Sequence, residues 1–305
     1  MARTIYVLGS LNIDFSIEID NFPKVGETIH CEKLLIGAGG KGANQALALV
    51  RNHLNVKMIG AVGNDNYGQG LINNLKANKI DTSNISLKTT GQTGHAFVLR
   101  YNENNRIIVD AGVNSLLTVD DVTKALSNAN EGDFLLAQLE TPLEVARSAF
   151  KLAKSKGMIT LLNPAPARTL PSDFLIDIDY LLMNEVECEE ITKVKPTSKK
   201  ALLKIRKYLR QTNNNLKAVI TCGSEGSYYV DQTTLEKSPA FKIKPLDTTG
   251  AGDAFIGAFI YALTEKLNIS KALRYANASG ALASLKVGAQ NAIPTKEEID
   301  EFLSL

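Results

Sequence analysis

From residue 118 onward, short apolar runs alternate with longer segments in which apolar residues recur at helical spacing. The runs predict strands at 134–137, 158–162, 180–183, 218–222 and 227–230, and the later segments predict helices beginning near 251, 270 and 295. Strands that are apolar throughout and alternate with helices are typical of a mostly parallel sheet covered on both faces. Residues 4–8 and 57–62 read as strands of the same kind, and helices are predicted from near Gly42 and over 67–77.

Two earlier stretches have a different pattern. Phe15, Ile17 and Ile19 alternate with polar residues, 28–36 is extended up to Gly37, and 93–100 and 106–109 predict two strands joined at 102–105. Alternation is typical of a half-exposed sheet rather than of a buried parallel one. We therefore expect one α/β domain over 1–305, with a small separate sheet from about 14–36 and 93–110. Such a sheet leaves an apolar face that a ligand or a second subunit would cover.

Polar residues follow several of the predicted strands. They are Asn12, Asp14, Glu140, Asn163, Asn184 and Thr221. Ligands of open α/β sheets bind at the carboxyl ends of the strands. The sequence therefore predicts one site at this edge of the sheet.

Composition excludes several function classes. The net charge is +2 and no block of Lys and Arg dominates, so neither nucleic acid nor an anionic membrane is expected as a partner. No apolar run approaches the roughly 18 residues that a membrane span needs.

The three cysteines, Cys31, Cys188 and Cys222, are far apart and form no C-x-x-C pair. This pattern fits a reducing compartment, and a cytoplasmic location is expected.

The segment 247–255, DTTGAGDAF, carries the most informative chemistry. Free N–H groups at a helix start bind anions, and glycines let a phosphate approach the main chain. A carboxylate at Asp253 would normally repel that phosphate, so its presence needs a separate reason. One reason is that it can orient and deprotonate a hydroxyl that attacks the phosphate. The alternative is an Asp that merely favours the helix dipole in the first turn.

Residues 37–42 also satisfy the pattern G-x-G-x-x-G, with Asp65 about 20 residues further on, as in a dinucleotide-binding oxidoreductase. Extended segments precede this loop, however, whereas the fingerprint normally follows the first strand. Asp65 also lies in a turn-like run, G-N-D-N. Neither glycine-rich segment is a P-loop, because neither supplies G-x-x-x-x-G-K-[ST].

Several motifs together resemble the ribokinase-like sugar kinases. Besides 247–255 they are GSLNID at 9–14, GGKGANQA at 39–46, LE at 139–140, NPAP at 163–166 and NEVE at 184–187. The resemblance follows the family's order over nearly the whole chain. It implies ATP-dependent transfer of the γ-phosphoryl group to the primary hydroxyl of a pentose, with ribose giving ribose 5-phosphate. Deoxyribose, fructose or a nucleoside is the alternative substrate, and a sugar-binding regulator without catalysis is the alternative of another class.

The resemblance also implies roles for individual residues. Asp253 would be the catalytic base, and the N–H groups of Gly250, Ala251 and Gly252 would stabilise the transferring phosphoryl group. The implied sugar-binding residues are Asn12, Ile13, Asp14, Gly40, Lys41, Gly42, Ala43, Asn44, Glu140 and Asp253. The implied nucleotide-binding residues are Asn184, Thr221, Cys222, Gly223, Ser224, Glu225, Gly226, Gly252 and Asn277. Read without the resemblance, Asn184 and Glu187 form a helix capping box, and 221–226 is a β-turn.

Two cations and one partner complete the implied picture. Mg²⁺ would be held near Glu187 through water. K⁺ would be held largely by main-chain carbonyls at Asp247, Thr249, Ala283, Lys286, Gly288 and Ala292. The small sheet would close over the sugar as a lid and form the contact of a homodimer.

Overall fold

The main sheet of the computed structural model, which describes residues 3–101, 104–171 and 173–304, has nine strands. They are β1 (Thr4–Leu8), β4 (Asn55–Gly63), β5 (Asp81–Lys88), β8 (Phe134–Ala137), β9 (Ile159–Leu162), β10 (Tyr180–Asn184), β11 (Lys217–Thr221), β12 (Ser227–Val230) and β13 (Leu235–Ser238). Their order is β13-β12-β11-β10-β9-β8-β1-β4-β5. Pairing is parallel from β5 to β11, and β12 and β13 are added antiparallel at one edge. The predicted fold class is confirmed.

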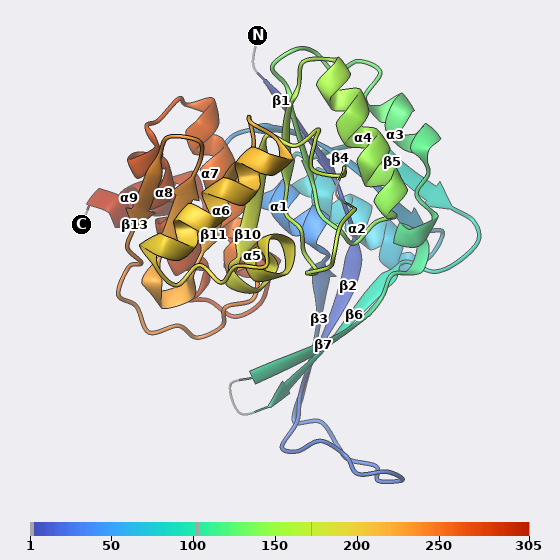
Figure 1. Ribbon diagram of the computed structural model, residues 1–305. Coiled ribbons are helices and arrows are strands. Elements are labelled where there is room, and N and C mark those ends of the chain that lie inside the picture. The colour runs from blue at the N-terminus through green and yellow to red at the C-terminus, as the bar shows by residue number, and fades with distance from the viewer. Residues whose placement is uncertain (1–2, 102–103, 172, 305) are drawn as a thin grey trace.

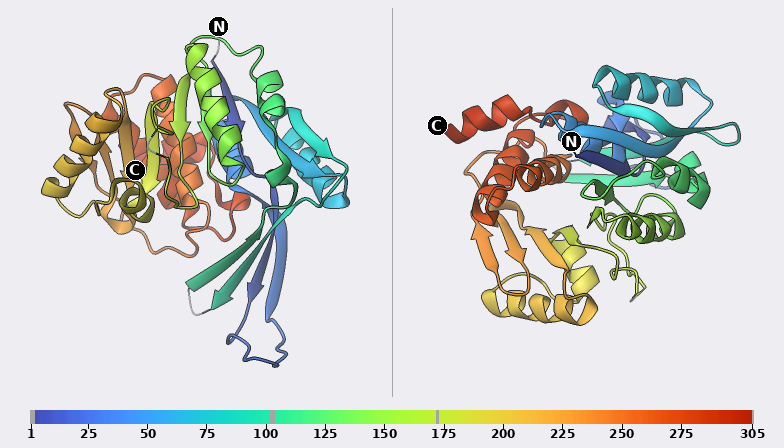
Figure 2. Two further views of the ribbon diagram at one scale, coloured as in Figure 1. Left: turned by 45° about the vertical axis from the view of Figure 1, so that its right-hand side comes forward. Right: turned by 90° about the horizontal axis from the view of Figure 1, so that it is seen from above.

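Helices cover both faces of this sheet (Figures 1 and 2). They are α1 (Lys41–Val50), α2 (Asn66–Ala77), α3 (Val119–Ala125), α4 (Leu143–Ser155), α5 (Glu185–Thr192), α6 (Lys199–Thr212), α7 (Ala251–Thr264), α8 (Ile269–Ala283) and α9 (Lys296–Ser304). Successive residues of β1 separate two cores: Ile5 and Val7 pack with α1, α7 and α8, whereas Tyr6 and Leu8 pack with α3 to α6. The two-residue period of a strand thus accounts for both layers.

The sequence did not predict the two edge strands. β5 reads DTSNISLK and is only partly buried, and β13 is short and polar. Edge strands contact one neighbour and face solvent, so they lack the apolar run that marks a buried strand. Their polar composition is the physical reason that sequence reasoning missed them.

A second sheet, called the lid sheet below, projects from one end of the main domain (Figures 1 and 2). Its strands are β2 (Asn12–Glu18), β3 (Lys33–Gly39), β6 (Gly94–Tyr101) and β7 (Asn104–Asp110), in the order β3-β2-β6-β7. The extended segment expected over 28–36 is displaced: residues 19–32 belong to no strand, and β3 runs on to Gly39. Pro23, Gly26 and several charged residues explain the irregular loop. Residues 102–103 of the expected connection lie outside the described residues.

The register of the lid sheet gives it two different faces. Phe15 is opposite Phe97 in β6 and Ile36 in β3, so these apolar side chains share one face. Asp14 is opposite Ala96, which pairs with Val109, so these residues share the other face. Phe15 and Ile17 share a face, as their alternation with polar residues predicted, and Phe97 and Leu99 lie opposite them in β6. Ile19 lies just beyond the end of β2.

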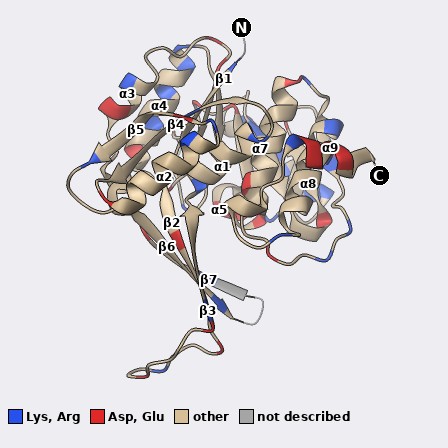
Figure 3. Ribbon diagram, turned by 180° about the vertical axis from the view of Figure 1, so that it is seen from behind, with Lys and Arg blue, Asp and Glu red and all other residues tan. Residues whose placement is uncertain are grey.

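Charges of both signs are scattered over the helices seen from behind (Figure 3). Among the described residues, no helix has both the length and the apolar character that crossing a bilayer requires.

Candidate active site

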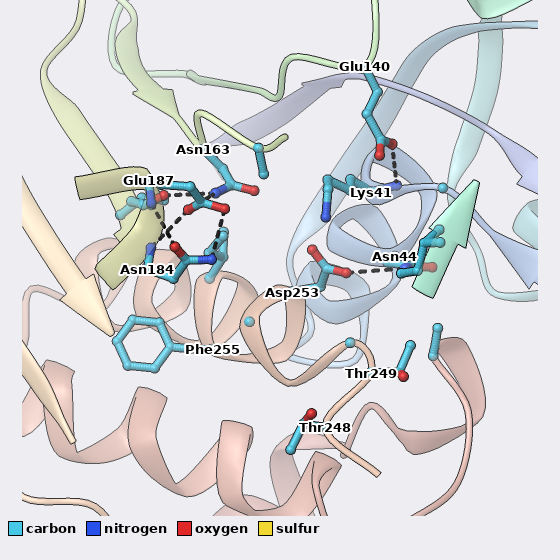
Figure 4. Close-up of a pocket in the computed structure, with 18 of the residues that line it drawn as sticks. Lys41, Asn44, Glu140, Asn163, Asn184, Glu187, Thr248, Thr249, Asp253 and Phe255 are labelled. Carbon is cyan, nitrogen blue, oxygen red and sulfur yellow. Dashed lines mark hydrogen bonds between the residues drawn. The ribbon is translucent and has the colours of Figure 1, made fainter. Parts of the chain in front are cut away.

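A cavity of about 310 Å³ lies where the lid sheet meets the carboxyl edge of the main sheet (Figure 4). It falls within the size range of small-ligand sites. Many of the polar residues expected at the site line it: Asn12, Asp14, Gly40, Lys41, Asn44, Glu140, Asn184, Glu187, Thr221, Thr249, Gly250, Gly252 and Asp253. The lid sheet contributes Ala96, Val98, Ile107 and Val109 as an apolar wall. Residues from widely separated parts of the chain therefore meet in one cavity.

Helices α1 and α7 bring their N-terminal turns together at this cavity. A Cβ atom added to Gly257 would lie 2.5 Å from the Cβ of Ala48, so the two helices pack without space for a larger residue. Asp253, in the first turn of α7, is only 9% exposed. Its Oδ2 accepts a hydrogen bond from Asn44 Nδ2 (3.1 Å), and its Oδ1 accepts one from Gln45 Nε2 (2.9 Å). Both donors lie on α1, which fixes the carboxylate at the cavity.

Glu140 and Asn12 are held by other polar groups. Glu140 Oε2 accepts hydrogen bonds from the Ser10 hydroxyl and from the N–H of Lys41 (3.2 Å). Asn12 is buried, and its Oδ1 accepts a hydrogen bond from Asn114 Nδ2 (2.9 Å). These contacts preorganise two residues expected to bind a ligand.

Lys41 places its ammonium group among carboxylates (Figure 4). Burial alone would lower its pKa, but Asp253, Glu140, Glu187 and Asp14 together raise it above the usual value. The lysine is therefore a protonated cation inside the cavity. The sequence predicted Lys41 as part of a glycine-rich loop, but it did not predict this cluster of acids around its side chain.

Asp14 titrates in the neutral range. Burial, with the charges of Glu140 and Asp253, raises its pKa to about 7, and Lys41 opposes the shift. A Cβ atom on Gly39 would lie 2.1 Å from the Asp14 carboxylate, so glycine leaves the space that this side chain occupies.

Asn184 and Glu187 form the capping box that the spacing predicted. The Asn184 side chain accepts from Glu187 N (2.8 Å), and Glu187 Oε2 accepts from Asn184 N (2.8 Å). Glu187 is 7% exposed and lines the cavity. Burial raises its pKa although hydrogen bonds oppose the shift. The structural role is thus present, and the carboxylate still lies beside the ligand space.

The start of α7 has an open anion-binding geometry. Gly250 has φ 77°, which glycine adopts without strain, and no side chain caps the helix. A Cβ on Gly252 would meet nothing within 4 Å. In the part of the chain that the structure describes, the Gly252 N–H donates to no protein acceptor, whereas the Ala251 N–H donates to the Thr248 carbonyl (3.2 Å). Ala251 does not line the cavity, so Gly252 offers the freer donor.

The residues expected near a nucleotide base form a separate cluster at the edge of the sheet. The turn is closed by the hydrogen bond from Cys222 N to Gly226 O (2.7 Å), and Gly226 has φ 97°. A Cβ on Gly226 would lie 2.1 Å from the carbonyl oxygen of Ser238, which also accepts a hydrogen bond from Asn277 Nδ2 (3.1 Å). Gly226 and Asn277 therefore contact the same segment.

The loops expected to hold K⁺ are joined by one carboxylate. Asp247 Oδ1 accepts from Thr249 N (2.9 Å), and its Oδ2 accepts from Gly288 N (3.0 Å). Burial would raise the pKa of Asp247, but these hydrogen bonds lower it. Within the described ranges, no group of three or more His, Cys, Asp or Glu side chains has the spacing of a metal site.

The dinucleotide-binding interpretation of 37–42 is not supported. A Cβ on Gly42 would lie 2.6 Å from the main chain of Gly9, so this glycine allows α1 to pack on the end of β1. Asp65 caps α2, accepting from Gly68 N (2.7 Å) and Thr93 N (2.8 Å). Its oxygens are committed to the main chain rather than to a ligand.

Some of the expected residues lie away from the cavity wall. They are Ile13, Gly42, Ala43, Ala251, 222–226, Asn277, Asp247, Ala283, Lys286, Gly288 and Ala292. The sequence predicted a lid sheet with an apolar face, but it did not identify the four apolar residues of that sheet that form one wall of the cavity, nor Gln45 and Gln138 behind the cavity. The alternation along 94–110 signals that wall, but no motif signals the contact of Gln45 with Asp253.

Comparison with known proteins identifies the family of this chain. The model of the pfkB family carbohydrate kinases matches residues 2–296. A ribokinase of Staphylococcus aureus is 36% identical over 305 residues, with 99% of this chain and 100% of the relative covered. A deoxyribokinase of Salmonella typhi is 32% identical, with 99% of each chain covered. The structure of Arabidopsis thaliana ribokinase complexed with ribose and ATP superposes with a TM-score of 0.89, 28% identity and complete coverage of both chains.

The chain therefore belongs to the pfkB family of carbohydrate kinases. It is a sugar kinase, and the family resemblance drawn from its motifs is confirmed.

The pKa of Asp14 yields a prediction about stability. An Asp whose pKa is about 7 in the folded protein and about 3.8 unfolded stabilises the fold while it is protonated. That contribution is complete below pH 3.8 and is lost as the pH rises to about 7. Asp14→Asn carries no charge at any pH, so its free energy of unfolding should not fall in this way. We expect the difference in unfolding free energy between Asp14→Asn and wild type to change in favour of the variant by roughly 1–2 kcal/mol as the pH rises from 5 to 8. Urea unfolding of both proteins across this range measures the difference, and a difference independent of pH would contradict the prediction.

Proposed function

We propose that this kinase transfers the γ-phosphoryl group of ATP to the 5-hydroxyl of D-ribose and yields ribose 5-phosphate. The relatives named above as ribokinases support ribose, and the cavity supports a polyhydroxylated ligand. Asp14 Oδ1 and Asn44 Oδ1 are buried acceptors with no hydrogen-bond partner among the described residues. An unpaired buried acceptor is costly, and a sugar hydroxyl is the donor that satisfies it. These two acceptors beside Asp253 are the observation on which the proposal rests.

In the proposed reaction, Asp253 accepts the proton of the sugar's primary hydroxyl. The hydroxyl oxygen bonds to the γ-phosphorus of ATP while the bond from that phosphorus to the bridging oxygen breaks, and ADP leaves with the electron pair. The N–H of Gly252 and the ammonium of Lys41 stabilise charge on the phosphoryl oxygens. The apolar wall of Ala96, Val98, Ile107 and Val109 excludes water, which would otherwise accept the phosphoryl group.

The residues present fit Mg²⁺, which would enter with ATP. Glu187 supplies hard oxygen ligands, but its oxygens already accept hydrogen bonds from Asn184 and Asn163. A carboxylate whose oxygens already accept hydrogen bonds can bind a cation through the cation's water ligands, and Mg²⁺ usually keeps several of these. Mg²⁺ bound there would neutralise charge on the phosphates. Asn184, with Thr221 at the end of β11, lies on the same wall and would contact the nucleotide.

We propose that K⁺ binds between the loops that Asp247 joins. Rings of backbone carbonyl oxygens hold K⁺ in selective sites by replacing its hydration shell. The residues that would supply carbonyls are Asp247, Thr249, Ala283, Lys286, Gly288 and Ala292. A Cβ atom added to Gly250 would lie 3.2 Å from Ala289, so the start of α7 is close to these loops. Order in the loops would therefore support the start of the helix.

The base assignment predicts the behaviour of Asp253→Asn. The variant keeps the shape and the hydrogen bond to one amide, so sugar and ATP should bind nearly as in wild type. Loss of the proton acceptor should lower kcat by about 10² or more. Steady-state kinetics with titration of both ligands measures this effect. Turnover equal to wild type would exclude Asp253 as the base.

Substrate selection tests the sugar assignment. Removing a hydroxyl leaves buried acceptors of the site unpaired, so ribose should exceed 2-deoxyribose in kcat/KM by about 10-fold or more. Coupled measurement of ADP release over a panel of pentoses, with and without K⁺, gives the order. An Asp14→Ala enzyme lacks one of these acceptors, so its ratio of kcat/KM for ribose to that for 2-deoxyribose should be smaller than in wild type. The opposite preference in wild type would assign the enzyme to deoxyribose instead.

The outer face of the lid sheet supports a homodimer. Leu34, Ile36, Phe97 and Ile108 are 49%, 55%, 37% and 61% exposed, and the register places them on the face away from the cavity. Contiguous exposed apolar residues on a sheet mark an interaction surface. A second copy presents the same face, as a two-fold symmetric contact requires.

Sedimentation at micromolar concentration should therefore give a species near twice the chain mass of 33.0 kDa. Ile36→Asp should shift this species to the monomer. Leu203→Asp, at an apolar position on α6 that is 47% exposed against 55% for Ile36, is the matched control and should leave the dimer unchanged. A monomer in the wild-type protein would refute the dimer.

A further inference from the structure

A chain of buried carboxamide side chains runs behind Asp253. Gln45 and Gln138 are both fully buried, and neither is among the residues that line the cavity. Gln138 Nε2 donates to Gln45 Oε1 (2.6 Å), and Gln45 Nε2 donates both to Asp253 Oδ1 (2.9 Å) and to Asn163 Oδ1 (3.0 Å). Asn163 Nδ2 in turn donates to the Leu182 carbonyl (2.8 Å) and to Glu187 Oε2 (3.4 Å).

The direction of this chain is fixed at its ends. An ionised carboxylate and a backbone carbonyl only accept hydrogen bonds. Asp253 therefore faces the amino group of Gln45, and the Leu182 carbonyl faces the amino group of Asn163. The oxygen of Asn163 is then left to accept from Gln45, and the oxygen of Gln45 accepts from Gln138. Each amide has one orientation that satisfies its neighbours.

Holding Gln45 in this orientation has a cost. Gln138 Oε1 is buried and has no hydrogen-bond partner among the described residues. A Cβ atom on Gly9 would lie 2.1 Å from this oxygen, so the backbone leaves space for it without pairing it. An unpaired buried oxygen destabilises the fold. The compensating contact is the hydrogen bond that Gln138 Nε2 donates to Gln45 Oε1.

We propose that Gln45 is the positioning residue of Asp253. Gln45 and Asn44 each donate to a different oxygen of the carboxylate, so together they fix its rotation. Gln45 reaches Glu187, on the side proposed for the metal, through Asn163. The general base and this acid are thereby held at a set separation. The proposal rests on the role assigned to Asp253 in the proposed function.

A double-mutant cycle separates positioning from simple core packing. Gln45→Met keeps the length of the side chain but removes the donor. If Gln45 acts through Asp253, this change should lower kcat roughly 10- to 100-fold in wild type, as expected for a displaced reacting group, with each KM altered less than about threefold. In the Asp253→Asn background it should lower kcat less than about twofold, because no base remains to be positioned.

Asn52→Leu is the matched control. Asn52 is also a buried amide of the same region, hydrogen-bonded to the Ala48 carbonyl (2.8 Å) and to the Tyr275 hydroxyl (3.1 Å), but it does not contact Asp253. Any loss of kcat that it causes should be equal in the two backgrounds. Should Gln45→Met fail to fold, Gln138→Leu removes the donor that orients Gln45 and should show the same dependence on Asp253.

The outcomes distinguish this inference from the proposed function. If Asp253→Asn turns over like wild type, the base assignment fails and the inference fails with it. If Asp253→Asn is slow but Gln45→Met lowers kcat by the same factor in both backgrounds, or not at all, only the positioning role of Gln45 is overturned. A loss confined to the background that retains Asp253 supports it.

Discussion

The packing of α1 against α7 is the contact on which the site depends. Gly257 and Ala48 let the two helices approach closely, and their first turns meet at the carboxyl edge of the sheet. Asn44 and Gln45 thereby reach a residue more than 200 positions away, as the hydrogen bonds to Asp253 record. The central α/β core supplies rigidity, because every strand between β5 and β11 is paired on both sides. Rigid elements of this kind hold reacting groups in place better than loops do.

The electrostatics of the cavity follow from crowding acids in a buried space. Asp14, Glu140, Glu187 and Asp253 act on one another, and Lys41 is the cation among them. Burial, together with the charges of Glu140 and Asp253, raises the pKa of Asp14 to about 7. In the proposed reaction, Mg²⁺ and Lys41 would offset the charge of ATP beside these acids.

Sequence patterns predicted most of the central fold because buried strands must be apolar along their whole length. β8 and β12 occur at the predicted residues, and β1 does as well. The edge strands β5 and β13 were missed, since a strand that faces solvent needs no apolar run. The bounds of the lid strands were displaced for a similar reason. Turn residues in 19–32 interrupt the extended pattern without saying where pairing resumes.

The candidate site was predictable to the extent that its residues follow strands or open helices. Asn12, Asp14, Glu140 and Asn184 do so, and all of them line the cavity. Long-range side-chain partners were not predictable in this way. The contact of Gln45 with Asp253, and the cluster of acids around Lys41, depend on how α1 packs on α7. A single sequence carries no local signal for such a contact.

The proposed reaction requires the sugar's primary hydroxyl to lie beside Asp253, in line with the phosphoryl group at the start of α7. The most direct test identifies the position of the phosphate in the product. The enzyme is supplied with ATP, Mg²⁺ and ribose labelled with ¹³C, and phosphorus–carbon coupling is read by NMR. The proposed reaction predicts coupling to C5, with one sugar phosphate formed for each ADP released. Phosphate on C1, or ADP released without phosphorylated sugar, would contradict it.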